Sequence, residues 1–423
     1  MVTLDPVTQS NYAEITTRHV HFDWLIDWKL RRISGSATHE LVANQDNVKQ
    51  VILDTSHLEI TGVEVSGIPV KYDLKQRHPV MGSALVVSLP STPHKGGQIA
   101  LKINYNTTTQ CTAVGWLDKE QTYGKKFEYL FSQCQPTYSS SVTSILPVLM
   151  SALRVSPPSD GPVHEGKEVG AEPVKYQYNQ VIEPHSVLML PANYMRDDAP
   201  KPIPIPSYLI AIASGNVIYK PFASVSGCSW KTGVWTEPEQ MDAAFWEFNQ
   251  DTANYVHEAE KMLTPYEFGV YDLLLLPPSF PYGGMENACL TFVTPTLLAG
   301  DRSLVDVVAH EISHSWFGNN VSCADSGHFW LNEMPLNITK YQRLVIDYAY
   351  GEDPDDAYSS VPYEKGSNFL LYLERLLGGL DVFLPYARDY VNTFRGRSIR
   401  TDEWKTHLFD YFEKHGGEDK LKL

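Results

Sequence analysis

Hydrophobic and polar positions alternate along much of the first half of the chain. From residue 99 to 105, Ile99, Leu101, Ile103 and Tyr105 alternate with smaller or polar residues. This period of two is typical of half-buried strands, and it recurs over residues 40–110 between clusters of turn-forming residues. The pattern predicts a twisted, saddle-like and mostly antiparallel β domain over residues 1–218. We expect residues 204–211 to include its last strand.

The pattern changes in the second half, where apolar residues recur at helical spacing. Thr236 and Glu239 resemble a capping box that opens a helix. An apolar run over 271–276 has the length of a buried strand. Further helices are predicted at 304–317, with Ser303 as N-cap, at 363–377 before Gly378-Gly379, and from residue 402 onward. The order of elements predicts an α+β chain of several domains, with a second domain over residues 219–423.

Composition excludes several classes of protein. The chain has 423 residues, with 34 Lys plus Arg against 50 Asp plus Glu, a formal net charge of −16. An acidic protein is a poor partner for nucleic acid or an anionic membrane surface. No run of about 20 apolar residues and no secretory signal is visible, so we expect no membrane span. The five cysteines are scattered and odd in number, which indicates reduced thiols in a cytoplasmic protein, a location that can include the nucleus. We expect a monomer.

The sequence H-E-x-x-H at residues 310–314 carries the strongest chemical signal. On a helix, His310 and His314 leave the same face one turn apart, so both imidazoles can bind one Zn²⁺. Glu333, separated from His314 by eighteen residues, can supply a third ligand. Glu311 can then take a proton from a water at the open fourth position. The alternative is a surface helix with an ordinary polar pair.

A second motif, G-G-M-E-N, lies at residues 283–287. Gly283 and Gly284 allow the backbone to approach a ligand closely. Glu286 beside Met285 is a candidate anchor for a positively charged substrate group. The alternative is a solvated glutamate in a glycine turn.

Together these motifs resemble the gluzincin zinc aminopeptidases. The longer run over 278–301, with residues 130–135 and 357–366, is similar to the leukotriene-A(4) hydrolase/aminopeptidase branch. The resemblance covers nearly the whole chain. It implies a thermolysin-like zinc metallopeptidase domain after the β domain, and one Zn²⁺ per chain.

The resemblance also implies a role for each matching residue. His310, His314 and Glu333 match the zinc ligands, and Glu311 matches the general base. Glu286 matches the carboxylate that holds the free α-amino group of a peptide substrate.

The remaining matches concern the substrate. Tyr363 matches the phenol that stabilises the oxyanion, and Gln135 a polar residue of the amine pocket. Asp355 and Tyr358 match positions that line a lipid-epoxide pocket. The implied substrates are short peptides with a free N-terminus and, as a second activity, a lipid epoxide.

The sequence departs from the family at four places. Pro335 follows Glu333 closely, and only 29 residues separate Glu333 from Tyr363, so we expect one supporting helix to be missing. The segment after Gln135 is altered. Residues 181–201 resemble an insertion, which we expect to be a loop although the apolar run at 187–190 could form a strand. We also expect the family's helical C-terminal domain to be absent. Alternative splicing or a faulty gene model would produce such a pattern.

Three functions remain open from the sequence. The first is a zinc aminopeptidase with lipid-epoxide hydrolysis as a further activity. The second is a catalytically impaired variant that retains zinc or peptide binding. The third is a non-enzymatic interaction protein built on the β domain.

Overall fold

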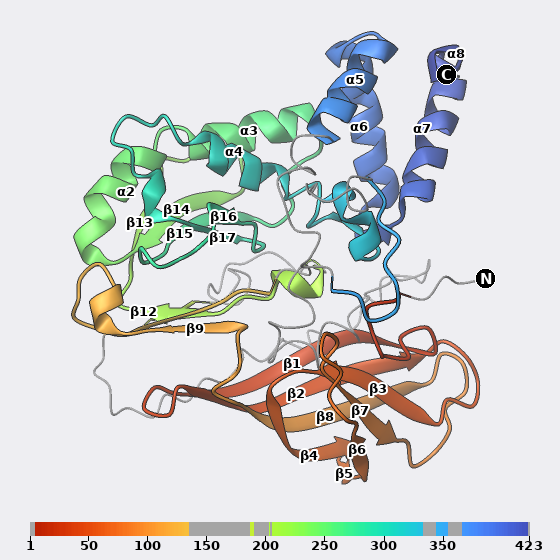
Figure 1. Cartoon of the computed structure of the whole chain (residues 1–423). Coiled ribbons are helices and arrows are strands. Elements are labelled where there is room, and N and C mark those ends of the chain that lie inside the picture. The colour runs from red at the N-terminus through yellow and green to blue at the C-terminus, as the bar shows by residue number, and fades with distance from the viewer. Residues whose placement is uncertain are drawn as a thin grey trace.

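A computed structural model describes residues 5–134, 187–189, 203, 205–332, 344–353 and 366–421. Figure 1 shows a β-rich lower part, a mixed α/β part above it, and a group of C-terminal helices beside the latter. The antiparallel strands come first along the chain and the helices later. The predicted α+β arrangement is therefore present.

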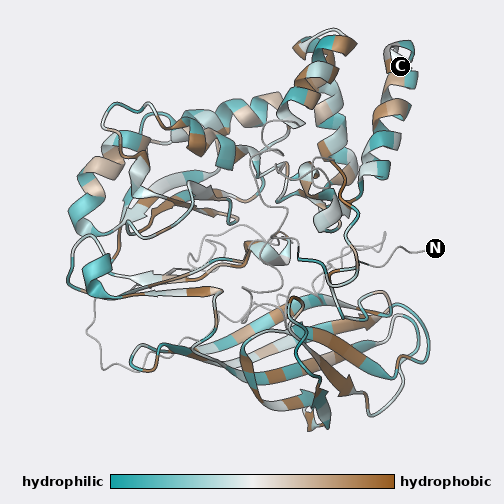
Figure 2. Cartoon of the chain, in the orientation of Figure 1, coloured by the Kyte–Doolittle hydropathy of each residue, from teal (hydrophilic) through white to brown (hydrophobic). Residues whose placement is uncertain are grey.

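The lower part contains two antiparallel sheets. One sheet has the order β1-β2-β8-β4-β5 and the other has the order β3-β7-β6. Their strands are β1 (Ile15–Asp27), β2 (Arg32–Ala43), β3 (Gln50–Thr55), β4 (Leu58–Val65), β5 (Ile68–Pro69), β6 (Tyr72–Leu74), β7 (Ser83–Ser88) and β8 (Gln98–Thr107). Along β8 the predicted alternation is confirmed, because Leu101, Ile103 and Tyr105 are buried and the residues between them are half-buried. Figure 2 shows the same alternation of hydropathy along these strands.

A four-stranded sheet lies between the lower and upper parts (Figure 1). Its order is β11-β12-β10-β9, with β9 (Val114–Leu117), β10 (Tyr129–Ser132), β11 (Val187–Met189) and β12 (Ala213–Gly215). In β10, Tyr129 and Phe131 pack into the core of the upper part, whereas Leu130 packs into the core of the lower part. Successive side chains of a strand point to opposite faces, so this one strand joins the two cores.

The upper part contains a mixed sheet with the order β13-β14-β15-β17-β16. Its strands are β13 (Ile218–Pro221), β14 (Lys231–Thr236), β15 (Val270–Leu275), β16 (Gly284–Met285) and β17 (Leu290–Val293). The strand predicted at 271–276 is confirmed as β15, whose residues are all buried. In Figure 1, α2 (Met241–Phe248), α3 (Thr252–Met262) and α4 (Asp306–Ser313) cover one face of this sheet.

The C-terminal elements pack beside this domain. They are β18 (Val321–Cys323), β19 (Arg397–Ile399), α5 (Ser367–Leu377), α6 (Leu380–Phe394), α7 (Thr401–His415) and α8 (Glu418–Leu421). β18 and β19 pair in parallel, which ties the segment after α4 to the C-terminal helices. The predicted stop at Gly378 is confirmed, because this residue has φ +128° after the last turn of α5. The helix predicted from residue 402 is α7.

Several local predictions are wrong. Thr236 ends β14 and caps no helix; a 3₁₀ turn (Pro238–Gln240) precedes α2 instead. The α4 helix is shorter than 304–317, and its N-cap is Val305 rather than Ser303, whose N–H is bonded to Asp301. In 204–211 the structure has a 3₁₀ turn (Ser207–Leu209), and the strand follows as β12.

The segment expected to be a loop at 181–201 includes a strand. Residues 187–189 form β11, which pairs antiparallel with β12. The free edge of β12 offers backbone partners that outweigh the weak local signal. The other residues of 181–201 lie outside the described part of the chain.

Candidate metallopeptidase site

Helix α4 brings the H-E-x-x-H residues together. Val308 and Ile312 bury one side of the helix in the core, so His310 and His314 lie together along another side. Their Nε2 atoms are 3.1 Å apart and their ring planes meet at 88°. Two imidazole nitrogens that bind one tetrahedral Zn²⁺ at about 2.0–2.1 Å lie roughly 3.3 Å apart. The pair therefore has the spacing that a shared metal requires.

A hydrogen bond from the ring nitrogen that faces away from His310 fixes the orientation of His314. Its Nδ1 lies 3.0 Å from the carbonyl oxygen of Phe317, so Nδ1–H donates there and Nε2 keeps its lone pair for the site. Gly318 has φ +119°, and a Cβ there would come within 3.2 Å of His314 Nδ1. Burial lowers the pKa of His314 to about 4, so the ring is neutral near pH 7, as a metal ligand must be.

His310 lies at the mouth of the site. Its side chain reaches solvent, yet desolvation by the surrounding protein, followed by the neighbouring His314, lowers its pKa. Both imidazoles are therefore ready to act as neutral ligands.

Two buried carboxylates face this histidine pair. Glu286 and Glu311 are 3% and 5% exposed, and each has a ligand atom within 4.8 Å of the other and of His314. Burial raises the pKa of Glu286 to about 7, although its own backbone and His310 oppose the rise. The alternative of a solvated Glu286 is thus excluded. The Glu286 carbonyl oxygen also accepts a hydrogen bond of 2.9 Å from Asn319.

The segment that carries the glycine pair passes close to the Glu311 carboxylate. Strand β16 is the edge of its sheet, with Gly284 opposite Val293 and Met285 opposite Phe292. A Cβ at Gly284 would overlap the Glu311 carboxylate. The glycine therefore lets the edge strand pass directly beside the carboxylate.

A hydrogen-bond network that the sequence did not reveal supports the site. The Tyr208 hydroxyl donates to the Gly318 carbonyl oxygen at 3.1 Å and accepts from Asn332 Nδ2 at 2.7 Å. Asn332 Oδ1 accepts from the backbone N–H of Cys323 at 2.8 Å. Gln133 donates to the Met285 sulfur at 3.3 Å. Tyr208 lies 75 residues before Gly283, so no local spacing marks it, whereas Gln133 lies in the run 130–135 that contributed to the family resemblance.

Five predicted site residues lie outside the described part of the chain. They are Gln135, Glu333, Asp355, Tyr358 and Tyr363. Glu333 follows directly after Asn332, which the network above holds near Gly318. The described part thus contains the two histidines, both acidic residues and the glycine pair.

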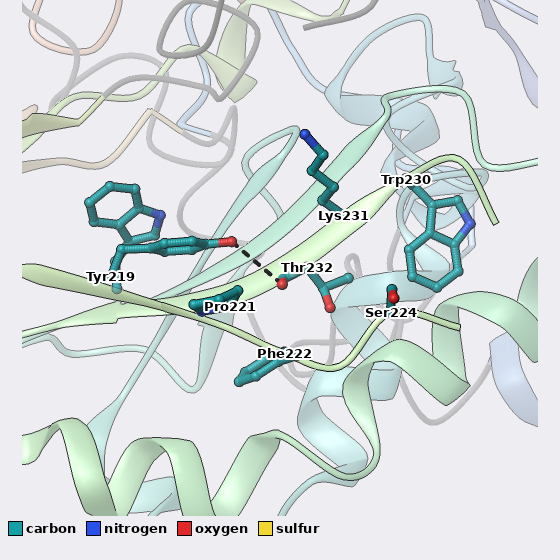
Figure 3. Close-up of a pocket in the computed structure, with 8 residues that line it drawn as sticks. Tyr219, Pro221, Phe222, Ser224, Trp230, Lys231 and Thr232 are labelled. Atoms are coloured by element: carbon teal, nitrogen blue, oxygen red, sulfur yellow. Dashed lines mark hydrogen bonds between the residues drawn. The ribbon is translucent and has the colours of Figure 1, made fainter. Parts of the chain in front are cut away.

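A separate hollow of about 380 Å³ lies over β13 and β14. Figure 3 shows Tyr219, Phe222 and Trp230 around it, with Lys231 extending from the strand. The Tyr219 hydroxyl lies 3.5 Å from the carbonyl oxygen of Thr232. None of its lining residues belongs to the predicted site.

The fold and the site together define a metallopeptidase, and comparison with known proteins identifies the family. The peptidase M1 N-terminal domain matches residues 16–146, and the peptidase family M1 domain matches residues 246–348 and 336–415. The chain therefore belongs to peptidase family M1.

Individual relatives define the branch. The chain is 37% identical over 465 residues to leucine aminopeptidase 2 of Sclerotinia sclerotiorum, covering 96% of this chain and 71% of that protein. It is 36% identical over 466 residues to leukotriene A-4 hydrolase of Xenopus laevis, covering 97% and 70%. For leucine aminopeptidase 2 of Yarrowia lipolytica the identity is 36%, and 96% of this chain spans 65% of that protein.

The native structure of yeast LTA4 hydrolase has a TM-score of 0.81 at 29% identity, covering 100% of this chain and 69% of that one. These likenesses confirm the predicted leukotriene A4 hydrolase/aminopeptidase branch and the predicted fold class. The chain spans about two thirds of the length of these relatives. Among the described residues, no helix is both long enough and apolar enough to cross a bilayer.

Proposed function

We propose that this chain is a zinc aminopeptidase that removes N-terminal residues from short peptides. One observation carries the proposal: the His310 and His314 nitrogens converge beside two buried carboxylates at the edge strand β16. His310, His314 and Glu333 would hold one Zn²⁺. A bound Zn²⁺ supplies Lewis acidity that polarises a carbonyl and acidifies water.

The protein's own residues bind and orient the substrate. A free edge strand can pair with an extended backbone, so Gly283, Gly284 and Met285 are suited to align a peptide. Glu286 would accept the α-ammonium group, and this positive charge would offset the cost of burying its carboxylate. Because that anchor lies beside the histidine pair, cleavage would be confined to the N-terminal residue.

Proton transfer falls to Glu311. Its carboxylate lies between the histidines and β16, where it can take a proton from the attacking water and return it to the leaving amine. We assign the stabilisation of the oxyanion to the Tyr363 hydroxyl, which donates without being charged.

The finer assignments follow from the branch. The names of relatives include leukotriene A-4 hydrolase, so we propose lipid-epoxide hydrolysis as a second activity, with Gln135, Asp355 and Tyr358 in its pocket. We also propose a cytoplasmic location, supported by five cysteines of which none forms a disulfide. We propose the domain boundary after residue 218, which is the first residue of β13.

The impaired variant is the second candidate. The M1 domain matches in two segments that overlap at 336–348, which supports a shorter connection after Glu333. Loss of supporting contacts around a metal commonly costs about 10–100-fold in affinity or activity.

The test is hydrolysis of an aminoacyl fluorogenic amide by the zinc-loaded chain. Glu311→Gln removes the base and should lower turnover by about 10²–10⁴-fold without changing zinc content. Glu258→Gln is the matched control, because Glu258 is an exposed helical residue paired with Lys261; its turnover should equal that of the wild type. No turnover by the zinc-loaded wild type would favour the impaired variant, and unchanged turnover in Glu311→Gln would overturn the assigned mechanism.

A further inference from the structure

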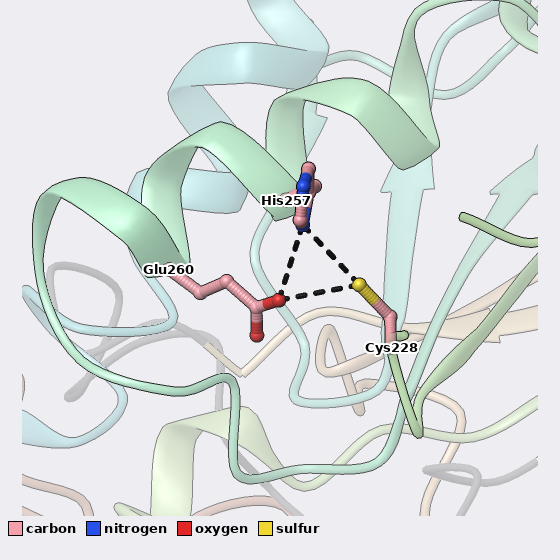
Figure 4. Close-up of side chains that lie close together, drawn as sticks. All are labelled: Cys228, His257 and Glu260. Carbon is pink, nitrogen blue, oxygen red and sulfur yellow. Dashed lines mark hydrogen bonds and ion pairs between the residues drawn. The ribbon is translucent and has the colours of Figure 1, made fainter. Parts of the chain in front are cut away.

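A second group of metal-binding side chains lies outside the site described above. Cys228, His257 and Glu260 converge in Figure 4. Cys228 Sγ is 3.2 Å from His257 Nδ1 and 3.3 Å from Glu260 Oε1, and the last two atoms are 3.4 Å apart. The proposed peptidase mechanism uses none of these residues.

Two elements bring the three residues together. His257 and Glu260 are three residues apart on α3, so they share one face of the helix. Cys228 comes from the loop between β13 and β14, where its N–H donates to the carbonyl oxygen of Val225. The cluster therefore connects this loop to α3.

The carboxylate of Glu260 is held in place from its far side. Its Oε2 accepts hydrogen bonds from Trp230 Nε1 at 3.1 Å and from the backbone N–H of Tyr266 at 3.2 Å. Oε1 is thereby aimed at the sulfur and the imidazole. Such outer contacts commonly orient the ligands of metal sites.

The geometry argues against a nucleophile activated by a histidine. In such an arrangement the acid and the nucleophile bind different ring nitrogens. Here the thiol and the carboxylate both face Nδ1 of His257, so no proton relay runs through the ring.

The same geometry suits a metal ion. Bonds of about 2.3 Å to sulfur and about 2.0–2.2 Å to nitrogen and oxygen place tetrahedral ligands roughly 3.3–3.6 Å apart. The three separations lie at or just below this range. The side chains of His257 and Glu260 are 25% and 18% exposed, so an ion can enter and a water can complete the coordination.

We propose that Cys228, His257 and Glu260 form a second zinc site, with its fourth position open to solvent. Thiolate, imidazole and carboxylate together suit Zn²⁺ and not Mg²⁺ or Ca²⁺, which prefer oxygen ligands. Binding exchanges the thiol proton for the metal and fastens the β13–β14 loop to α3, which lies beside α4 in Figure 1.

Cobalt substitution tests this site separately from the catalytic one. Co²⁺ bound by a thiolate absorbs strongly in the near ultraviolet through charge transfer, and the proposed ligands His310, His314 and Glu333 include no sulfur. The full-length chain titrated with Co²⁺ should show this band. Cys228→Ser should abolish it and reduce the bound cobalt by one ion per chain.

Control variants make the result specific. Cys111→Ser, which changes another half-buried free cysteine, should retain the band. His257→Gln keeps the thiol and should weaken cobalt binding at this site by more than about 100-fold, beyond the roughly 10–100-fold typical of outer contacts. A wild type saturated with Co²⁺ that lacks the band, or a band that survives in Cys228→Ser or is unaffected by His257→Gln, would overturn the proposal.

Discussion

The contact between Gly284 and Glu311 shows how a single missing side chain shapes the site. A Cβ at Gly284 would overlap the Glu311 carboxylate, whereas the nearest atom to a Cβ at Gly283 is Val307 Cγ1 at 3.9 Å. Two neighbouring glycines of one motif therefore face different constraints. Of the two, only Gly284 must lack a side chain for Glu311, the proposed general base, to keep its position.

This difference predicts opposite outcomes for two matched substitutions. Gly284→Ala should displace the Glu311 carboxylate and lower kcat about 10²-fold or more, because a misplaced base loses most of its contribution. Gly283→Ala leaves the Glu311 carboxylate in place, so we expect kcat to stay within about threefold and any contact of the new Cβ with the aligned peptide to raise KM. Turnover of an aminoacyl amide and thermal unfolding would be measured for both. Equal kcat in the two variants would contradict the argument.

Single residues were predicted where the chemistry is local in sequence. The spacing of His310, Glu311 and His314 on a helix required no tertiary information, and the structure places the three as expected. Burial of Glu286 depends on packing around it, so the sequence left its solvated alternative open. Tyr208 carried no signal at all, because a lone tyrosine is far more often a packing residue.

At the level of elements, helix α4 depends on segments distant in sequence. The 3₁₀ turn (Ser207–Leu209) supplies Tyr208, whose hydroxyl joins Gly318 to Asn332. Asn332 in turn precedes Glu333. This hydroxyl therefore connects the backbone behind His314 to Asn332, the residue that precedes the proposed third ligand in the sequence.

We predict that Tyr208→Phe weakens zinc binding at the catalytic site. Loss of the hydroxyl leaves Asn332 Nδ2 and the Gly318 carbonyl without this partner, and such losses typically cost about 10–100-fold in metal affinity. The measurement is the zinc concentration that restores half of the turnover to chelator-treated protein. Tyr129→Phe is the control, because the buried Tyr129 hydroxyl has no hydrogen-bond partner among the described residues. A Tyr208→Phe curve that overlays the control would contradict the role of the network.

Elements were predicted correctly where the hydrophobic pattern extends over many residues, and poorly where the prediction rested on a single residue at a boundary. The alternation in β8 and the apolar run of β15 can be read without knowledge of tertiary contacts, and both strands are present in the structure. The cap at Thr236 failed because that residue is the last of β14, where sheet pairing with β13 takes precedence over the capping pattern. At β11 the sequence left a strand open but favoured a loop, because three apolar residues form a strand only when a neighbouring edge is available.

At the scale of the whole molecule, two buried ionisable groups of the N-terminal sheets respond to pH in opposite directions. His39 lies in β2 between Val20 and Leu101 and is completely buried. Burial lowers its pKa from 6.5 to about 3. Asp54 has the opposite behaviour, because burial raises its pKa from 3.8 to about 6 against hydrogen bonds from Thr8 and Gln9.

These shifts have opposite effects on stability. Unfolded His39 binds a proton below pH 6.5 and folded His39 does not until about pH 3, so the folded state loses stability as the pH falls through this window. Folded Asp54 holds its proton more tightly than the unfolded chain, so its contribution is full below pH 3.8 and is lost as the pH rises through about 6. Between pH 4 and 6 the two groups partly cancel.

Removing one group at a time should separate them. His39→Leu should make the folded state less sensitive to acid. It should reduce the loss of unfolding free energy between pH 7.5 and 4.5 by about 3 kcal/mol, since each pKa unit is worth about 1.4 kcal/mol. Asp54→Asn should increase the same loss by about 2 kcal/mol, because it removes the compensating group. Hydrogen exchange, corrected for intrinsic rates, measures the local opening free energy at both pH values, in the β2 and β8 amides for His39→Leu and in the β3 and β7 amides for Asp54→Asn. Shifts of the same sign in the two variants would mean that one of the two side chains is not titrating inside the folded sheets as its burial requires.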